Sequence, residues 1–169
     1  EQALAVRGIG YEVIGSWNFY DRREAKDCLS MLKFLVNKKD GVAFHKVCGL
    51  LTGLGDVSIG KIENHAKREN IDLLQACEDY AEHGKTNTIR NGCAALVKIY
   101  KDATYDFKQP SQCISKLLLG FKYDNFLLNA YKNDAQERME NVKQVIDSCS
   151  NFNGQIDGVQ KYLQQVSLV

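Results

Sequence analysis

Two glycines separated by a single leucine are the residues whose spacing points most directly to a chemistry. Gly53-Leu54-Gly55 lies between two segments of helical periodicity. Glycine lets a turn adopt positive φ and approach another backbone closely, and the N–H groups that open the next helix favour an anion. This is the pattern of a helix–hairpin–helix, which contacts phosphates without reading base sequence. A plain helix–helix turn, with glycine just after the first helix, explains the local pattern equally well.

Two polar residues extend this candidate phosphate site into the following helix. Ser58 offers a hydroxyl at the start of the helix, and Lys61 lies one turn further on, where we expect it to reach a second phosphate. An ordinary solvated lysine is an equally good interpretation of Lys61. The predicted phosphate-contacting residues are Gly53, Leu54, Gly55, Ser58 and Lys61.

Two segments come close to the phosphate-loop pattern G-x-x-x-x-G-K-[ST] without satisfying it. Residues 55–62 end in Ile62, where a hydroxyl must hold magnesium, and residues 79–86 begin with Asp79 in place of the first glycine. Neither segment follows a buried strand, which a phosphate-cradling loop requires. The sequence therefore predicts no ATP hydrolysis by this chain alone.

The cysteines and histidines predict neither a metal site nor a nucleophile. No two of the six cysteines lie closer than sixteen positions, so no C-x-x-C pair exists. The three histidines share no helix face with a carboxylate or a cysteine at ligand spacing. Most of the cysteines fall among apolar residues at helical spacing, as buried free thiols do. We therefore expect reduced thiols in a reducing compartment, the cytoplasm.

Composition narrows the class of protein further. The chain has 169 residues, of which 44% are hydrophobic and 25% charged, with one proline, and this excludes a disordered or low-complexity chain. The net charge of +1 excludes a polycation. Residues 21–70 nevertheless hold ten basic and seven acidic side chains, an excess that a solvated helix face explains nearly as well as an anionic partner. No apolar run approaches the roughly 20 residues that span a membrane.

The elements that must position these residues are mostly helices. Residues 11–14 alternate like a short strand, and Asp21 with Glu24 predicts a capping box for a helix that ends near Asn37. Asp40 predicts the cap of a second helix, and a third follows the hairpin. Further helical periods occupy 89–100, 114–121, 139–149 and 159–166, and residues 166–169 look strand-like. We predict a mainly α, compact multi-helix domain with short strands at its two ends.

Several segments together resemble a known family. Residues 9–15 read IGYEVIG, 18–27 read NFYDRREAKD, 53–56 read GLGD and 134–142 read DAQERMENV. In this order and at these separations they are similar to the signature of the UvrD/Rep/PcrA helicases of superfamily 1, over nearly the whole chain. The resemblance is specifically to the 2B subdomain of those proteins.

That resemblance implies a piece inserted in a RecA-like parent domain. Residues 1–20 would form a seam with the parent, 21–150 the helical 2B subdomain, and 151–169 a return segment. The parent would be an ATP-dependent 3′→5′ DNA helicase that unwinds DNA in replication or repair. ATP and magnesium would bind in the parent, and this fragment would hold no cofactor. The implied partners are duplex DNA near a single-strand junction, the remaining helicase domains and regulatory proteins. In the family this piece contacts duplex DNA ahead of the fork through glycine-bearing hairpins, and rotates between open and closed states.

The resemblance also assigns roles to the signature residues and shows where this sequence departs from the family pattern. For Tyr20 we expect core packing rather than base stacking. Thr52 stands where the family usually carries arginine, which removes one phosphate-pairing charge. This loss and the near-neutral net charge favour an alternative, a protein-interaction module without significant DNA binding of its own. The intact hairpin and the local positive excess favour DNA. The residues expected at the seam with the parent are Phe19, Tyr20, Glu24, Lys26, Asp27, Arg138, Glu140 and Asn141.

Overall fold

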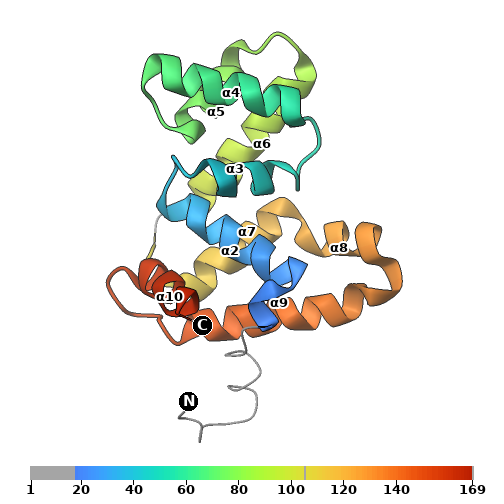
Figure 1. Cartoon of the computed structure of the whole chain (residues 1–169), viewed down its shortest axis with the longest axis vertical. Helices are drawn as coiled ribbons and strands as arrows, with labels where there is room; N and C mark the ends of the chain where they lie inside the picture. The colour runs from blue at the N-terminus through green and yellow to red at the C-terminus, as the bar shows by residue number, and fades with distance from the viewer. Residues whose placement is uncertain (1–17, 105, 169) are drawn as a thin grey trace, which may run out of the picture.

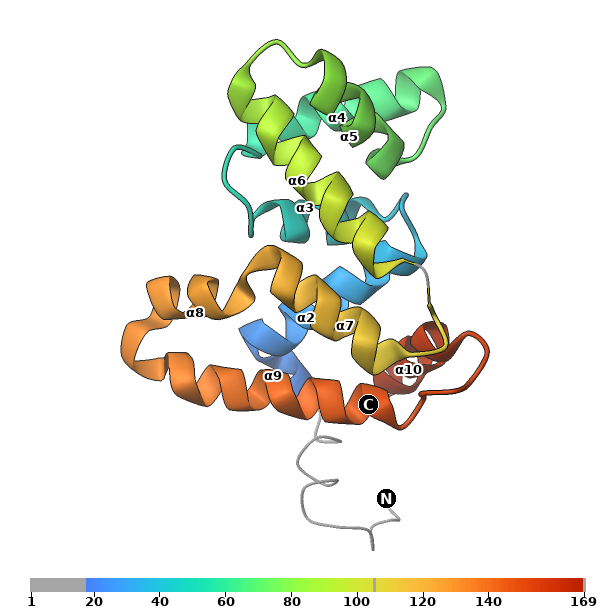
Figure 2. The same cartoon turned by 180° about the vertical axis from the view of Figure 1, so that it is seen from behind.

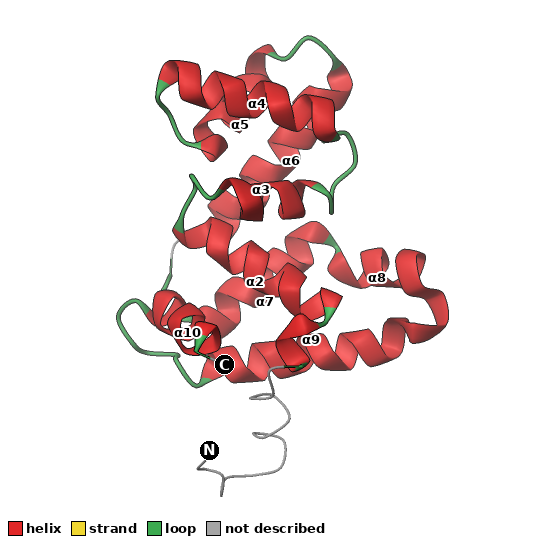
Figure 3. Ribbon diagram, viewed as in Figure 1, coloured by secondary structure: helices red, strands yellow, loops and turns green. Residues whose placement is uncertain are grey.

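The chain folds into helices joined by short loops (Figure 3). The computed structural model describes residues 18–104 and 106–168, and every regular element within these ranges is a helix. The predicted mainly α, multi-helix fold class is thereby confirmed. In chain order the elements are η1 (Phe19–Asp21), α2 (Arg23–Val36), α3 (Gly41–Cys48), α4 (Asp56–Glu69), α5 (Leu73–His83), α6 (Asn87–Ala103), α7 (Pro110–Phe121), α8 (Tyr123–Tyr131), η2 (Lys132–Asp134), α9 (Ala135–Ser150) and α10 (Gly158–Ser167).

Two groups of helices share one hydrophobic core. Helices α3 to α6 form one group, and α2 with α7 to α10 forms the other (Figures 1 and 2). Helix α2 packs against α3, α7, α9 and α10, and α6 packs against α7. The Tyr100 hydroxyl of α6 also donates a hydrogen bond to the Met31 carbonyl of α2 at 3.0 Å, so the two groups are joined at several places. The buried apolar side chains form one cluster that draws on both groups. The chain thus carries its own core, as an independently folding domain does.

Helix α2 lies at the centre of the molecule. Cys28, Leu32 and Leu35 recur at helical spacing and are fully buried. The helix ends at Val36, with Asn37 as its C-cap, as the sequence predicts. Because this helix is covered from several sides, Glu24, Asp27 and Ser30 are also buried.

The two predicted helix caps have different outcomes. Asp40 caps α3, since its side chain accepts a hydrogen bond from the Ala43 N–H at 3.0 Å. The predicted capping box of Asp21 and Glu24 is wrong: the residue at the N-cap of α2 is Arg22, which makes no side-chain cap bond. Asp21 belongs to η1, and the Glu24 carboxylate turns into the interior.

Two helices were not predicted from the sequence. Helix α5 opens with a capping box, in which the Asp72 side chain accepts from the Gln75 N–H at 2.8 Å and the Gln75 side chain accepts from the Asp72 N–H at 3.0 Å. The D-x-x-Q spacing was therefore a usable signal. Helix α8 begins directly after Lys122, a left-handed residue with φ of 52°, where no glycine marks the break.

The C-terminal segment is helical. Val166 and Ser167 belong to α10, so the strand-like interpretation is wrong for them; Val166 continues the helical spacing of Val159 and Tyr162. The strand predicted at 11–14 lies outside the described residues. Val159 and Tyr162 are buried, and α10 packs against α2 and α7. This segment therefore adds to the common core, while the domain limits inferred from the resemblance stay predictions.

The cysteines behave as structural thiols. All six are buried and none is in a disulfide. Over residues 18–104 and 106–168, no group of three or more potential ligands is arranged to hold a metal ion. In the same ranges, no helix is long and apolar enough to cross a bilayer.

Candidate nucleic-acid interface

Gly53 makes the turn between α3 and α4. Its φ is +90°, a conformation that residues with a side chain rarely adopt. A Cβ atom here would lie 2.8 Å from the carbonyl oxygen of Thr88, at the start of α6. Both the conformation and the space therefore require glycine. The turn is held close against α6.

Leu54 anchors the hairpin on the same helix. Its side chain is 3% exposed and rests on Gly92, where an added Cβ would lie 2.9 Å from Leu54 Cγ. The leucine packs inward, as the sequence predicts. Contact with a phosphate at this residue would come from the backbone.

Gly55 has a different role from Gly53. It is the N-cap of α4, with φ −84° and ψ −177°, and a Cβ built on it meets no atom within 4 Å. Of the two glycines, Gly53 alone has a positive φ, and the phosphate contact predicted for both stays a prediction. Gly55 leaves the space in front of the helix open, because a cap without a side chain covers none of the first-turn N–H groups.

The first turn of α4 is exposed to solvent. Asp56 is exposed and Val57 is 74% exposed. The first N–H groups of a helix have no partner within it, and they carry the positive end of the helix dipole. The acidic side chain of Asp56 lies at the same helix end. The site therefore combines anion-favouring backbone groups with one opposing charge.

Ser58 and Lys61 line a cavity of about 350 Å³ between α4 and the loop that joins α5 to α6. Lys85 on that loop and His83 at the end of α5 bring basic side chains to the same cavity, and Thr86 is the N-cap of α6. The fold thus places a second basic turn beside the predicted residues. Sequence reasoning noticed Gly84-Lys85-Thr86 as an imperfect phosphate loop but did not connect it with Lys61. The other residues of the lining are Tyr80 and Ile89.

Three of the expected seam residues contact one another. Glu24 is 2% exposed, and its carboxylate accepts hydrogen bonds from Arg138 Nη1 and Asn141 Nδ2, both at 2.7 Å. The guanidinium of Arg138 also lies 3.7 Å from the centroid of the Tyr131 ring. These signature residues hold α2 against α9. The burial of Glu24 is balanced by an ion pair and a hydrogen bond.

Asp27 forms a second buried polar cluster on α2. It accepts hydrogen bonds from the Tyr123 hydroxyl at 2.7 Å and from Arg23 Nε at 3.1 Å. Burial and the adjacent Asp27 carboxylate raise the pKa of Tyr123. The neutral phenol therefore remains a donor to Asp27.

The other expected seam residues lie both inside and outside the core. Phe19 is 2% exposed and Tyr20 packs edge-on against it at 5.1 Å, so packing rather than stacking on a base accounts for Tyr20. The Tyr20 and Tyr162 hydroxyls are 3.3 Å apart. Lys26 and Glu140 are exposed. Contact of these residues with a parent domain stays a prediction.

Residues 18–104 and 106–168 form a helical domain in which a tight glycine turn joins α3 to α4. Within that class the chain belongs to the UvrD-like helicase C-terminal domain family, whose model matches residues 1–167.

Proteins similar to this chain include ATP-dependent DNA helicases. Over 155 residues the chain is 25% identical to the ATP-dependent DNA helicase PcrA of Bacillus subtilis, covering 90% of this chain and 21% of that protein. It is 24% identical over 145 residues to the PcrA of Staphylococcus epidermidis strain RP62A, covering 84% and 20%. It is 23% identical to the PcrA of Staphylococcus aureus strain Mu50, with the same coverage. The chain spans about a fifth of the length of these relatives.

Proposed function

We propose that this chain is the 2B subdomain of an ATP-dependent 3′→5′ DNA helicase, and that it contacts duplex DNA ahead of the fork and regulates unwinding. The family and the PcrA relatives support the helicase context. Because the chain covers about a fifth of those relatives, ATP and magnesium would bind elsewhere in the longer protein. DNA and the remaining helicase domains are the partners that follow from this assignment.

The observation that carries the proposal is the open N-terminal turn of α4 beside two exposed lysines. Gly53 and Leu54 fix this turn against α6, so the N–H groups at the start of α4 are pre-positioned for a phosphate. Lys61 and Lys85 line one cavity, within reach of neighbouring phosphates of the same backbone. Such contacts position a duplex without reading its sequence.

The strength of binding follows from the charges at the site. Asp56 opposes a phosphate at the helix end, and Thr52 supplies no charge beside the hairpin. We therefore expect weak binding that depends strongly on salt. Regulation would come from engaging and releasing this contact as the subdomain rotates within the helicase.

The experiment is fluorescence anisotropy of the 169-residue chain with a 3′-tailed duplex and with the single strand alone. Affinity for the tailed duplex should exceed that for the single strand and fall steeply between about 50 and 200 mM salt. Lys61→Gln and Lys85→Gln should each weaken binding and reduce the salt slope by about one. Lys161→Gln is the matched control, since Lys161 is an exposed lysine on α10.

Two results would reject the hairpin assignment. One is equal affinity for the tailed duplex and the single strand. The other is a Lys161→Gln variant that loses as much affinity as Lys61→Gln. Far-UV circular dichroism of each variant shows that the helices are intact.

A further inference from the structure

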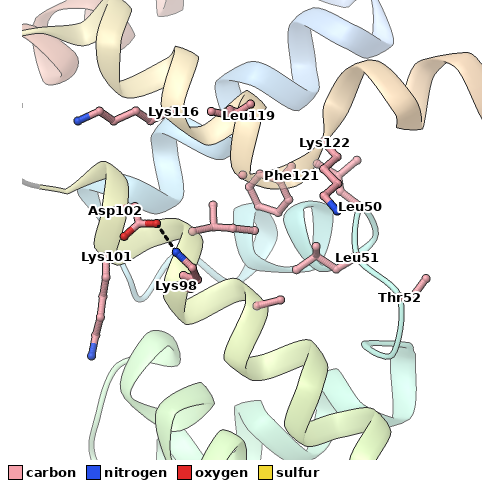
Figure 4. A pocket seen from close by; sticks show the side chains of 13 residues that line it. Leu50, Leu51, Thr52, Lys98, Lys101, Asp102, Lys116, Leu119, Phe121 and Lys122 are labelled. Atoms are coloured by element: carbon pink, nitrogen blue, oxygen red, sulfur yellow. Dashed lines mark hydrogen bonds and ion pairs between the residues drawn. The ribbon is translucent and has the colours of Figure 1, made fainter.

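A wide groove lies between α6, α7 and the loop that follows α3 (Figure 4). Its volume is about 920 Å³, at the upper end of the range for ligand-binding pockets. It is separate from the cavity beside Ser58 and Lys61, although Thr52, next to the hairpin, forms part of its edge. The groove therefore offers a second surface that the phosphate-contacting residues do not use.

The floor of the groove is apolar and partly exposed. Leu50 and Leu51 come from the loop after α3, Ile99 from α6, and Leu119 and Phe121 from the last turn of α7. Leu119 is 80% exposed, while Ile99 and Phe121 are almost buried beneath it. Leu119 and the partly exposed Leu50 and Leu51 line the same groove, so its apolar surface involves more than one side chain.

The rim of the groove is basic. It carries four lysines and a single acidic residue, Asp102. Lys98 pairs with Asp102 at 2.9 Å, across the α6 side of the groove (Figure 4). Lys122 lies on the opposite side beside Leu50, and the backbone of Lys122 is held in the left-handed conformation that ends α7. Lys101, also on α6, pairs with Glu78 of α5 at 3.4 Å. The fourth lysine of the rim is Lys116.

An apolar floor within a basic rim selects the chemistry of the occupant. A nucleic-acid backbone would satisfy the lysines but would leave the leucines and the phenylalanine without an apolar partner. A neutral apolar segment would cover the floor but would desolvate Lys122 without supplying it a carboxylate, whereas Lys98 and Lys101 already pair with Asp102 and Glu78. An amphipathic helix with leucine-type side chains on one face and carboxylates beside them satisfies both.

We infer that this groove is a docking site for an acidic amphipathic helix of a partner protein. Leucine-type anchors of the partner pack on Leu119, Phe121 and Leu51, and its carboxylates pair with the lysines of the rim. The inference does not depend on DNA binding by the hairpin, because the two surfaces share neither Lys61 nor Lys85.

The test measures anisotropy of the 169-residue chain with a fluorescein-labelled helical peptide of about 15 residues. The peptide carries leucines at i, i+3, i+4 and i+7 spacing and glutamates at its other positions. A second peptide keeps the leucines and replaces every glutamate with lysine. We expect a Kd of about 10 to 100 µM for the acidic peptide and at least tenfold weaker binding for the basic one.

Matched variants locate the binding site. Leu119→Glu and Lys122→Glu should each weaken binding of the acidic peptide by about fivefold or more, since both change the groove without entering the core. Leu128→Glu on α8 and Lys161→Glu on α10 make the same changes at exposed positions outside the groove, and should leave the Kd within about twofold.

Five results would overturn the docking site. These are no binding of the acidic peptide, equal binding of the two peptides, or equal losses in groove and control variants. The fourth is displacement of the peptide by duplex DNA with weaker duplex binding by Lys122→Glu, which would make the groove a nucleic-acid surface. Sedimentation of the free chain tests whether a second copy of the chain occupies the groove. A dimer that Leu119→Glu dissociates would also contradict the proposal.

Discussion

Replacing the two hairpin glycines one at a time should have unequal effects on stability. In Gly53→Ala, an L-residue must adopt φ of +90°, and a left-handed conformation costs about 1–2 kcal/mol. The added Cβ would also lie 2.8 Å from the Thr88 carbonyl oxygen, so the backbone must shift, at a typical cost of about 1–3 kcal/mol. The free energy of unfolding should therefore fall by about 3 kcal/mol.

Gly55→Ala should change stability by less than about 1 kcal/mol. The φ of −84° suits alanine, and a Cβ meets nothing within 4 Å. Lower entropy of the unfolded chain stabilises the variant by about 0.4–1 kcal/mol, and the poorer N-cap offsets this gain. Each variant adds one methyl group to the wild-type chain, so each is the control for the other.

Urea unfolding followed by far-UV circular dichroism measures this difference. For a chain of this length, about 3 kcal/mol corresponds to a decrease in Tm of about 6–12 °C for Gly53→Ala. Equal destabilisation of the two variants, or a loss below about 1 kcal/mol in Gly53→Ala, would refute the steric argument. It would also remove the basis for a rigid hairpin held on α6.

Three other perturbations test separate parts of the structure. Glu24→Ala leaves the Arg138 guanidinium without its carboxylate and should lower the free energy of unfolding by about 3 kcal/mol; a loss below 1 kcal/mol in urea would contradict the buried pair. Asp56→Asn removes the charge facing a bound phosphate and should raise duplex affinity about two- to fivefold in anisotropy at low salt, whereas unchanged or weaker binding would place the phosphate elsewhere. Burial raises the pKa of the Cys149 thiol to about 12, so the unfolded chain releases this proton first; stability should be complete below pH 9 and fall as the pH rises toward 12, and urea unfolding at pH 8 and pH 10 should show a smaller decrease in Cys149→Ala.

The parts of the fold that local patterns encode were predictable. The apolar spacing of α2, the Asp40 cap and the inward packing of Leu54 each depend on residues within a few positions of one another. Helix α8 was missed because no local signal marks its start. Its boundary is Lys122 in a left-handed conformation, for which lysine has no preference.

The parts that depend on distant residues could not be predicted. Glu24 pairs with Arg138, which lies 114 positions away in the sequence. The residue that we predicted as part of a capping box is therefore a buried carboxylate. Likewise, Lys85 reaches the Ser58 and Lys61 cavity only because α5 folds back beside α4. Family signatures record that such residues matter, and tertiary packing shows what each of them contacts.

Helix α6 connects the hairpin with the groove. Its first turns support the hairpin at Thr88 and Gly92, and its later turns form the groove wall at Lys98 and Ile99. Thr88 and Ile99 are about 16 Å apart along one uninterrupted helix of 17 residues. Because a helix is stiff along its axis, a displacement of the later turns of α6 also displaces its first turns. A protein bound in the groove would therefore also displace the turn that we propose as the contact with DNA.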